Sequence, residues 1–166
     1  MREQHCTLMF VVDDDSILLA FKKKGFGQGK WNGPGGKVEP NENEVEAAIR
    51  ETEEEVGVMP IDPEKVAHLK FSYEGKDMKP LYKDKDGPSL VIVHAYLAKK
   101  WEGIPAETEE MRPQWFKFSE VPYRQMWDDD QYWLPKVLGG KKLVARFKFD
   151  KDDKVASKNI GEVDKL

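Results

Sequence analysis

The sequence predicts a single α/β domain in which a mixed β-sheet is sandwiched between helices. Short apolar runs with strand character are interspersed with two helical segments along the chain. At 166 residues the chain suits one domain with an ordinary core, and the 39% apolar fraction with five Trp indicates a folded protein. The 35% charged residues and net charge of -4 indicate high solubility and give no basic footprint for a nucleic-acid polymer.

The elements can be placed in chain order. Predicted strands cover residues 7–12, 16–21, 66–73, 89–98, 115–118 and 143–149. Asp13-Asp14-Asp15 joins the first two strands, and we interpret these adjacent acids as a solvated hairpin loop. Residues 76–87, rich in Lys, Asp, Pro and Gly, are expected to form a surface loop insertion. The polar residues 150–166 are expected to be either a tail or the strand of an edge hairpin.

Two helices are expected, and the first has clear end signals. It covers residues 44–56, with Asn43 as the N-cap, Glu46 completing a capping box and Gly57 at the C-terminal cap. The second is expected to start near Asp130 and to end before two glycines at 139–140.

The first helix carries acids that predict a magnesium site. On a helical wheel Glu51 and Glu55 lie beside the buried stripe, with Glu54 a little further round. The last turn is a poor place for acids, because the helix dipole disfavours each by about 0.3–1 kcal/mol. Mg²⁺ takes a few hard oxygen ligands together with substrate phosphate oxygens, so it would relieve this repulsion. A solvated acidic helix is the alternative that the acids alone leave open.

The spacing of the surrounding residues is more specific. The run is Gly36, five residues, Glu42, seven residues, and then Arg50-Glu51-Thr52-Glu53-Glu54-Glu55-Val56-Gly57-Val58. This run resembles the Nudix box, and Thr52 is its one departure, since the family prefers Ile, Leu or Val there. The resemblance implies a Nudix fold over residues 1–166. It also implies a hydrolase of nucleoside diphosphate derivatives that uses Mg²⁺, for which Mn²⁺ could substitute.

Segments outside the box resemble the MutT-type branch of this family, which hydrolyses oxidised purine nucleoside triphosphates. They are residues 22–27, 30–33, 110–116 and 127–133. The departures are Pro34 where an aromatic residue is usual, Asp128 where Pro is usual, and the insertion at 76–87. The resemblance implies conversion of 8-oxo-dGTP or 2-oxo-dATP to the monophosphate and pyrophosphate, which would sanitise the nucleotide pool.

The resemblance also assigns site residues. The implied metal ligands are the Gly36 carbonyl oxygen, Glu51, Glu54, Glu55 and Glu110. Arg50 is expected to orient carboxylates, and either Glu55 or Glu110 is expected to take the proton of the attacking water. The implied substrate-binding residues are Thr7, Lys22, Phe26, Asn32, Gly35, Gly36, Lys37, Trp127, Asp129 and Asp130.

Asp129 and Asp130 give a particular expectation at the base end of the pocket. If the two carboxyl groups are buried together, they repel, so one of them should be protonated near neutral pH. An O–H donor then lies beside an acceptor, a pair that can match the edge of an oxidised purine. Trp127 can stack on the face of that base.

Other functions agree less well with the sequence. Within the family, the alternatives are a hydrolase of another nucleoside diphosphate derivative and a non-catalytic nucleotide-binding module. Gly25, Gly27 and Gly29 beside Lys30 do not make a P-loop, because Trp31 follows the lysine. The three histidines are far apart in the sequence and lack Cys partners at zinc spacing, so each is expected to have a structural or surface role.

Location and assembly follow from simple features. The lone Cys6 cannot form an internal disulfide and is expected to be a buried thiol in a reducing compartment. Neither a signal peptide nor a membrane span is expected. We therefore expect a monomer in the cytoplasm, and the sequence leaves the nucleus and the mitochondrion as alternative locations.

Overall fold

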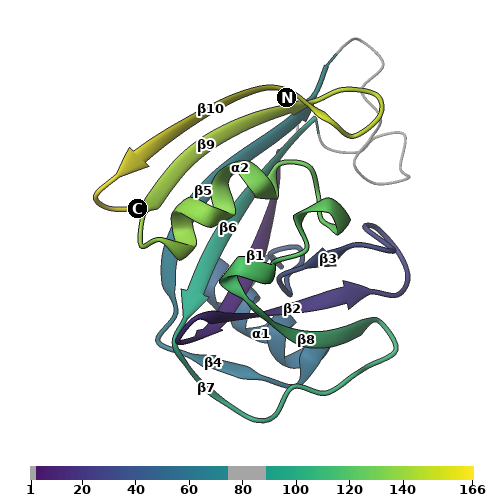
Figure 1. Ribbon diagram of the computed structural model, residues 1–166, viewed down its shortest axis with the longest axis vertical. Coiled ribbons are helices and arrows are strands. Elements are labelled where there is room, and N and C mark those ends of the chain that lie inside the picture. The colour runs from purple at the N-terminus through teal and green to yellow at the C-terminus, as the bar shows by residue number, and fades with distance from the viewer. Residues whose placement is uncertain (1–2, 75–88) are drawn as a thin grey trace.

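The computed structural model describes residues 3–74 and 89–166, so the predicted insertion at 76–87 lies outside the described residues. An eight-stranded mixed sheet has the order β10-β9-β5-β6-β1-β2-β3, and β8 pairs with β2 (Figure 1). Its strands are β1 (Glu3–Asp13), β2 (Ser16–Lys22), β3 (Trp31–Asn32), β5 (Glu64–Tyr73), β6 (Leu90–Ala98), β8 (Met111–Lys117), β9 (Lys142–Phe149) and β10 (Val155–Val163). A separate pair comprises β4 (Met59–Ile61) and β7 (Lys100–Glu102).

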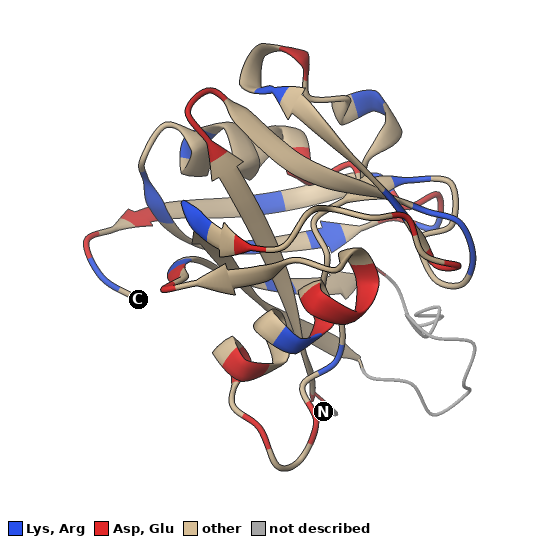
Figure 2. Ribbon diagram, turned by 90° about the horizontal axis from the view of Figure 1, so that it is seen from below, with Lys and Arg blue, Asp and Glu red and all other residues tan. Residues whose placement is uncertain are grey.

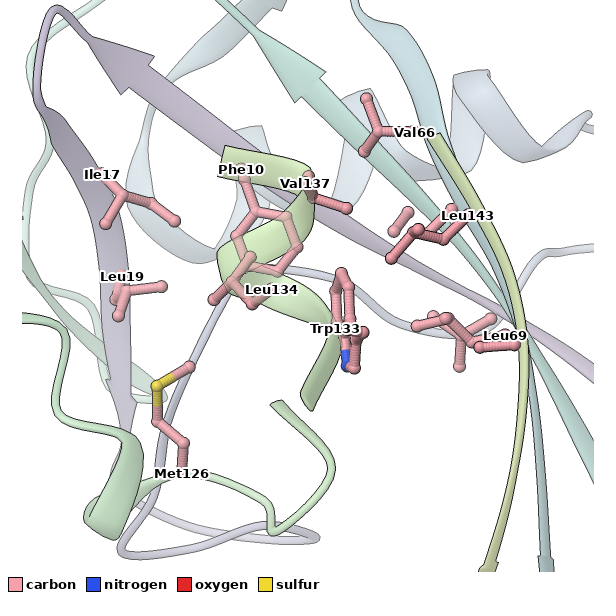
Figure 3. Close-up of a cluster of buried hydrophobic side chains, with 14 of the residues drawn as sticks. Phe10, Ile17, Leu19, Val66, Leu69, Met126, Trp133, Leu134, Val137 and Leu143 are labelled. Carbon is pink, nitrogen blue, oxygen red and sulfur yellow. The ribbon is translucent and has the colours of Figure 1, made fainter. Parts of the chain in front are cut away.

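Helices cover both faces of this sheet, as predicted. Figure 1 shows α2 (Asp130–Leu138) in front of the strands and α1 (Glu44–Val56) behind them. Because side chains alternate along a strand, β1 supplies both cores. Phe10 packs with Trp133 of α2 in one cluster, while Met9 packs with Ala48 of α1 in the other (Figure 3 shows the first cluster). Two short 3₁₀ helices, η1 (Phe118–Glu120) and η2 (Tyr123–Gln125), lead from β8 to α2.

The ends of α1 match the sequence signals. The Asn43 side chain accepts a hydrogen bond from the Glu46 backbone N–H at 2.9 Å, and Glu46 Oε1 accepts one from the Asn43 N–H at 3.3 Å. Gly57 ends the helix in the left-handed region, at φ 74°. The Thr52 hydroxyl, the departure from the family pattern, is buried and donates to the Ala48 carbonyl oxygen at 2.7 Å. The helix therefore accommodates Thr52 without an unsatisfied polar group.

Some elements differ from the prediction. The strand expected at 115–118 runs from Met111 to Lys117, and Phe118 begins η1 instead. The first half of this strand was not predicted because Pro113 argues against a strand there. Pro is nevertheless tolerated, because β8 pairs with β2 on one side only. The polar ending contains β10, which pairs antiparallel with β9 and forms an edge hairpin. Its polar composition suits an edge strand that is mostly exposed.

Three strands, β3, β4 and β7, were not predicted, since each has only two or three residues and too few side chains to show alternation. Within the described residues, no helix is long and apolar enough to cross a membrane.

Candidate active site

Two glycines bring the loop after β3 against β1 and α1. A Cβ atom on Gly35 would overlap the Thr7 carbonyl oxygen, and one on Gly36 would lie 2.6 Å from the carboxyl carbon of Glu51. The Thr7 backbone N–H donates to the Gly36 carbonyl oxygen at 2.8 Å, and the Thr7 hydroxyl donates to the same oxygen more weakly at 3.4 Å. The absence of side chains at both positions therefore lets this loop lie directly beside the acidic helix.

Arg50 holds several carboxylates in place. Its guanidinium donates to Glu42 at 2.6 and 2.9 Å, to Glu51 at 2.9 Å and to Glu54 at 3.3 Å. The hydrogen bond from Arg50 lowers the pKa of Glu42 to about 2, and these acids together raise the pKa of Arg50. Arg50 also donates to the Lys37 carbonyl oxygen at 3.3 Å. Such contacts are those of a residue that orients carboxylates.

Glu51 and Glu55 lie together at the inner side of α1. Their carboxyl groups are close enough to interact electrostatically, and only 5% of Glu55 is exposed. Burial raises the pKa of Glu55 to about 8, with the nearby Glu51 charge adding to the effect and Lys22 opposing it. Burial also raises the pKa of Glu51. Glu54, in contrast, is largely exposed. The acidic residues of α1 appear as broad red bands in Figure 2.

The carboxyl pair fits a divalent cation. Glu55 Oε2 is buried, and it has no hydrogen-bond partner among the described residues. A buried oxygen of this kind needs a ligand, and carboxylate oxygens are the donors that Mg²⁺ prefers. A cation here would also remove the repulsion that raises the pKa of Glu55. The residues present therefore fit the metal that the sequence pattern implies.

Glu110 reaches the same region through Lys22. Its carboxylate lies 3.7 Å from Lys22 Nζ and is about half exposed. The loop that carries Glu110 is attached to the end of α1, because the Thr108 hydroxyl donates to the Glu55 carbonyl oxygen at 2.9 Å. Glu110 is thus linked to the acidic pair through Lys22, whose charge also acts on Glu55, and it is more solvated than Glu55.

A cavity of about 200 Å³ opens beside this acidic group. Nine of the ten predicted substrate-binding residues line it: Thr7, Lys22, Phe26, Asn32, Gly35, Gly36, Trp127, Asp129 and Asp130. Lys37 is outside this lining, with an exposed side chain. Glu51, Glu54, Glu55 and Glu110 are not part of the lining, which reaches the acidic helix only through Gly36, next to Glu51, and Lys22, near Glu55. From there the cavity extends to the segment that the resemblance assigned to base recognition.

Asp129 and Asp130 form a buried carboxyl pair at the far end of the cavity, with 3% and 2% of each residue exposed. Burial and the neighbouring Asp129 charge raise the pKa of Asp130 well above its usual range, and burial raises that of Asp129 to about 6. Trp133 Nε1 donates to Asp129 Oδ2 at 2.8 Å. Asp130 Oδ2 is without a hydrogen-bond partner in the described part of the chain. The raised pKa of Asp130 favours its protonated form, which would place an O–H donor beside the Asp129 acceptor.

Aromatic side chains form the mouth of the cavity. Phe26 and Trp127 are stacked, with ring centroids 5.2 Å apart and planes at 26°, and Lys30 Nζ lies 5.3 Å from the Trp127 ring centroid. At the opposite side of the segment, Asp128 Oδ2 accepts a hydrogen bond from the Val155 N–H at 2.8 Å. The departure at Asp128 thus attaches the start of β10 to the segment that carries Trp127.

The sequence did not identify the apolar wall of the cavity. This wall is contributed by β1, β5, β6, β8 and β9, and its residues are Cys6, Leu8, Phe71, Val91, Val93, Met111 and Phe149. Each lies in a predicted or observed strand and looks like an ordinary core residue. Only the pairing of the strands reveals that one end of this core is left open.

The three histidines lie together in the structure although they are far apart in the sequence. His5 of β1 and His94 of β6 are hydrogen-bonded, with Nδ1 of His5 2.9 Å from Nε2 of His94. His68 of β5 packs edge-on against His94, with centroids 5.2 Å apart. They come together because β1, β6 and β5 are neighbours in the sheet.

Comparisons with known proteins agree with this geometry. The chain is 40% identical over 158 residues to the oxidized purine nucleoside triphosphate hydrolase of Mus musculus, covering 95% of this chain and 94% of that protein. It is 41% identical over 160 residues to the protein of the same name from Danio rerio, covering 96% of each. A crystal structure of a MutT protein from Bacillus halodurans superposes with a TM-score of 0.77 at 27% identity, covering 95% of this chain and 97% of that one. The NUDIX domain model matches residues 3–137, and the chain belongs to the Nudix hydrolase family.

Proposed function

We propose that this enzyme is a Mg²⁺-dependent pyrophosphohydrolase of oxidised purine nucleoside triphosphates such as 8-oxo-dGTP and 2-oxo-dATP. Water would break the bridge between the α and β phosphorus atoms, so the products are the nucleoside monophosphate and pyrophosphate. The two relatives that are 40% and 41% identical carry this substrate class in their names. The observation that carries the proposal is a cavity lined by the buried Asp129 and Asp130 pair and by Gly36, whose backbone lies against the Glu51 carboxyl group of the acidic helix.

Metal binding is proposed for Glu51, Glu54, Glu55 and Glu110, with the Gly36 carbonyl oxygen. The buried, unpartnered Glu55 Oε2 supports this assignment most directly. Mg²⁺ would neutralise phosphate charge and lower the pKa of a bound water, and Mn²⁺ could replace it. The Gly36 carbonyl oxygen would keep its bond from the Thr7 N–H and give up the weaker one from the Thr7 hydroxyl.

Glu55 is our candidate for the general base, in preference to Glu110. A base works best when its pKa lies near the working pH; burial holds the pKa of Glu55 at about 8 in the metal-free protein, and a nearby cation would lower it from there. Glu110 is half exposed and paired with Lys22, so its carboxylate is better solvated. The water proton would pass to a Glu55 carboxylate oxygen, while Arg50 fixes the neighbouring Glu51 carboxylate at 2.9 Å.

Base recognition is proposed for Asn32, Asp129 and Asp130, with Trp127 stacking on the face of the purine. The Asn32 amide oxygen accepts from the Gly33 N–H at 2.8 Å, which fixes the orientation of the amide. Asp130 Oδ2 is buried and, within the described residues, unpartnered, so it is free to meet the base edge. A pair in which one carboxyl is protonated supplies both a donor and an acceptor.

Lys22 and Lys37 are proposed to contact phosphate oxygens. Lys22 lines the cavity beside Glu55, while Lys37 is exposed next to the Gly36 backbone. We also propose a monomer acting on free nucleotides in the cytoplasm. The net charge of -4 supports a preference for small substrates over nucleic-acid polymers.

A substrate panel tests the proposal. Steady-state hydrolysis of 8-oxo-dGTP, 2-oxo-dATP, O6-methyl-dGTP and unmodified dGTP would be compared at one Mg²⁺ concentration, with pyrophosphate and monophosphate quantified. We expect kcat/KM for at least one oxidised nucleotide to exceed that for dGTP by tenfold or more. Equal values across the panel, together with faster hydrolysis of a nucleotide sugar or a capped RNA end, would overturn the assigned substrate class. Absence of turnover with every compound would indicate a binding module.

A further inference from the structure

A polar cluster unrelated to the catalytic acids lies where the start of α1 meets the sheet. It contains His5 of β1, His94 of β6, Glu44 of α1, and His68 and Lys65 of β5. The His5 and His94 rings are stacked with centroids 5.2 Å apart and planes at 16°.

Three of these residues present ligand atoms to one point. The His5 Nδ1 atom lies 2.9 Å from His94 Nε2, and that nitrogen lies 3.8 Å from Glu44 Oε1. One ligand atom from each residue lies within 4.8 Å of the other two. In the metal-free protein a single proton is shared between the two ring nitrogens, and a cation could replace it.

We propose that His5, His94 and Glu44 bind a borderline transition-metal ion, with Zn²⁺ as the best match. Two imidazoles with one carboxylate are a known three-ligand set for tetrahedral Zn²⁺, with the fourth position left to water. The catalytic acids, by contrast, offer oxygen alone and suit Mg²⁺. Zn–N bonds of about 2.0–2.1 Å place two tetrahedral nitrogen ligands about 3.3 Å apart. The two nitrogens therefore need to separate by about 0.4 Å, and because they now point at one another, each ring also has to tilt so that its nitrogen faces the ion.

Solvent can reach this point. A surface hollow of about 360 Å³ is lined by His5, Glu44 and their neighbours Glu3, Gln4, Val38, Glu42 and Asn43. The hollow gives an ion a route of entry and gives a water molecule room to complete the coordination. His94 is buried on the inner side, and burial lowers its pKa to about 4. Its ring is neutral at pH 7, as a metal-binding imidazole must be.

Lys65 opposes the ion and provides a specific test. Its Nζ lies 2.8 Å from His94 Nδ1. When His94 Nε2 binds a cation, Nδ1 must carry the hydrogen, so the Lys65 ammonium has to turn away. The ammonium also repels the bound ion. Removal of this charge in Lys65→Met should therefore tighten Zn²⁺ binding.

An ion at this position would fasten the start of the catalytic helix to two central strands. Glu44 is the first residue of α1, and Glu42, which borders the hollow, also accepts hydrogen bonds from Arg50 of the Nudix box. The reacting groups themselves are not involved. We therefore expect Zn²⁺ to raise the thermal stability of the protein, with little effect on the Mg²⁺ dependence of turnover.

Calorimetric titration of the chelator-treated, full-length protein with Zn²⁺ tests the proposal, with excess Mg²⁺ present to occupy the catalytic acids. We expect one Zn²⁺ per chain. His5→Gln and Glu44→Gln, both at partly exposed positions, should each weaken the affinity by at least about tenfold. At Zn²⁺ one hundred times its Kd, the Tm of the wild-type protein should rise by about 5–10 °C.

Three controls separate this site from others. His68→Gln alters a histidine that supplies no ligand, Glu53→Gln alters an exposed acid on the same helix, and Glu55→Gln disables the catalytic acids. All three should retain the wild-type Zn²⁺ affinity. The proposal is overturned if the wild-type protein binds no Zn²⁺, if His5→Gln and Glu44→Gln bind it as tightly as wild type, or if Glu55→Gln abolishes binding. Unchanged or weaker binding by Lys65→Met would overturn the assigned position of the ion.

Discussion

Replacement of Glu55 by Gln should stabilise the metal-free protein while it removes catalysis. Glu55 is 5% exposed and its pKa is about 8 instead of 4.5, so the fold holds this carboxyl protonated at pH 7. That proton binding costs the fold about 3 kcal/mol, because pH 7 lies about 2.5 pH units above the usual pKa and each unit is worth about 1.4 kcal/mol. A Gln side chain is neutral at every pH and avoids this cost.

The net gain is smaller than 3 kcal/mol. The buried amide has to satisfy its own N–H groups, which costs about 1–3 kcal/mol when partners are poor. We therefore expect Glu55→Gln to be more stable than wild type by about 1–2 kcal/mol at pH 7, or about 2–8 °C in Tm for a chain of this size. Because the pKa of Glu55 is raised in the folded state, holding this carboxyl protonated costs no stability below pH 4.5. The cost grows as the pH rises from 4.5 toward 8, and wild-type stability falls accordingly. At pH 5 the cost of proton binding falls to about 0.8 kcal/mol, so the variant should lose its advantage and be as stable as wild type or less stable by up to about 1 kcal/mol.

Circular dichroism melts of chelator-treated protein at pH 5 and pH 7 measure this effect. Glu53→Gln is the matched control, because Glu53 is an exposed acid on the same helix. Mg²⁺ should raise the Tm of wild type and of Glu53→Gln, and raise that of Glu55→Gln much less. A Glu55→Gln protein that is less stable than wild type by the same amount at both pH values would refute the reasoning that burial of a charge sets the properties of this residue.

Three further perturbations test other parts of the site. In Asp129→Asn, the ratio of kcat/KM for 8-oxo-dGTP to that for dGTP should fall by about tenfold while kcat is largely kept, because the buried carboxylate acceptor for the purine edge becomes an amide. An unchanged ratio in a steady-state assay would argue against the base pocket. Trp127→Ala should raise KM by about 5- to 150-fold through the loss of about 1–3 kcal/mol of stacking, and a wild-type KM would contradict the stacking role. Gly36→Ala places a Cβ atom 2.6 Å from the Glu51 carboxyl carbon, so activity should require at least about tenfold more Mg²⁺. The circular dichroism spectrum of the variant should be unchanged. An unchanged Mg²⁺ requirement would mean that the loop does not set the geometry of the acids.

The acidic end of the site was predictable because it is local. Arg50, Glu51 and Glu55 belong to one helix, whose cap signals at Asn43 and Gly57 fix its ends. Once these ends are known, helical geometry determines which acids face inward. A role for the glycine pair at 35–36 in the site was also predictable from local sequence, because no ordinary helix start requires two glycines there.

The rest of the site depends on strand pairing, which the sequence does not encode in any local pattern. Cys6 and Phe149 line one cavity although β1 and β9 are separated by two other strands of the sheet. His5 and His94 are hydrogen-bonded across 89 positions of the chain for the same reason. Lys37 shows the converse, since a residue adjacent to the glycine pair lies outside the cavity.

Pyrophosphate release from 8-oxo-dGTP by wild type and by Glu55→Gln, at saturating Mg²⁺, tests the central claim most directly. A general base contributes about 10²–10⁴-fold to the rate, and Glu55 is also a proposed metal ligand, so kcat should fall by at least about a hundredfold in the variant. Wild-type protein stripped of divalent cations should be similarly inactive and should recover on addition of Mg²⁺. Equal rates of release by the two proteins would contradict the claim that this buried carboxylate and its cation carry out the hydrolysis.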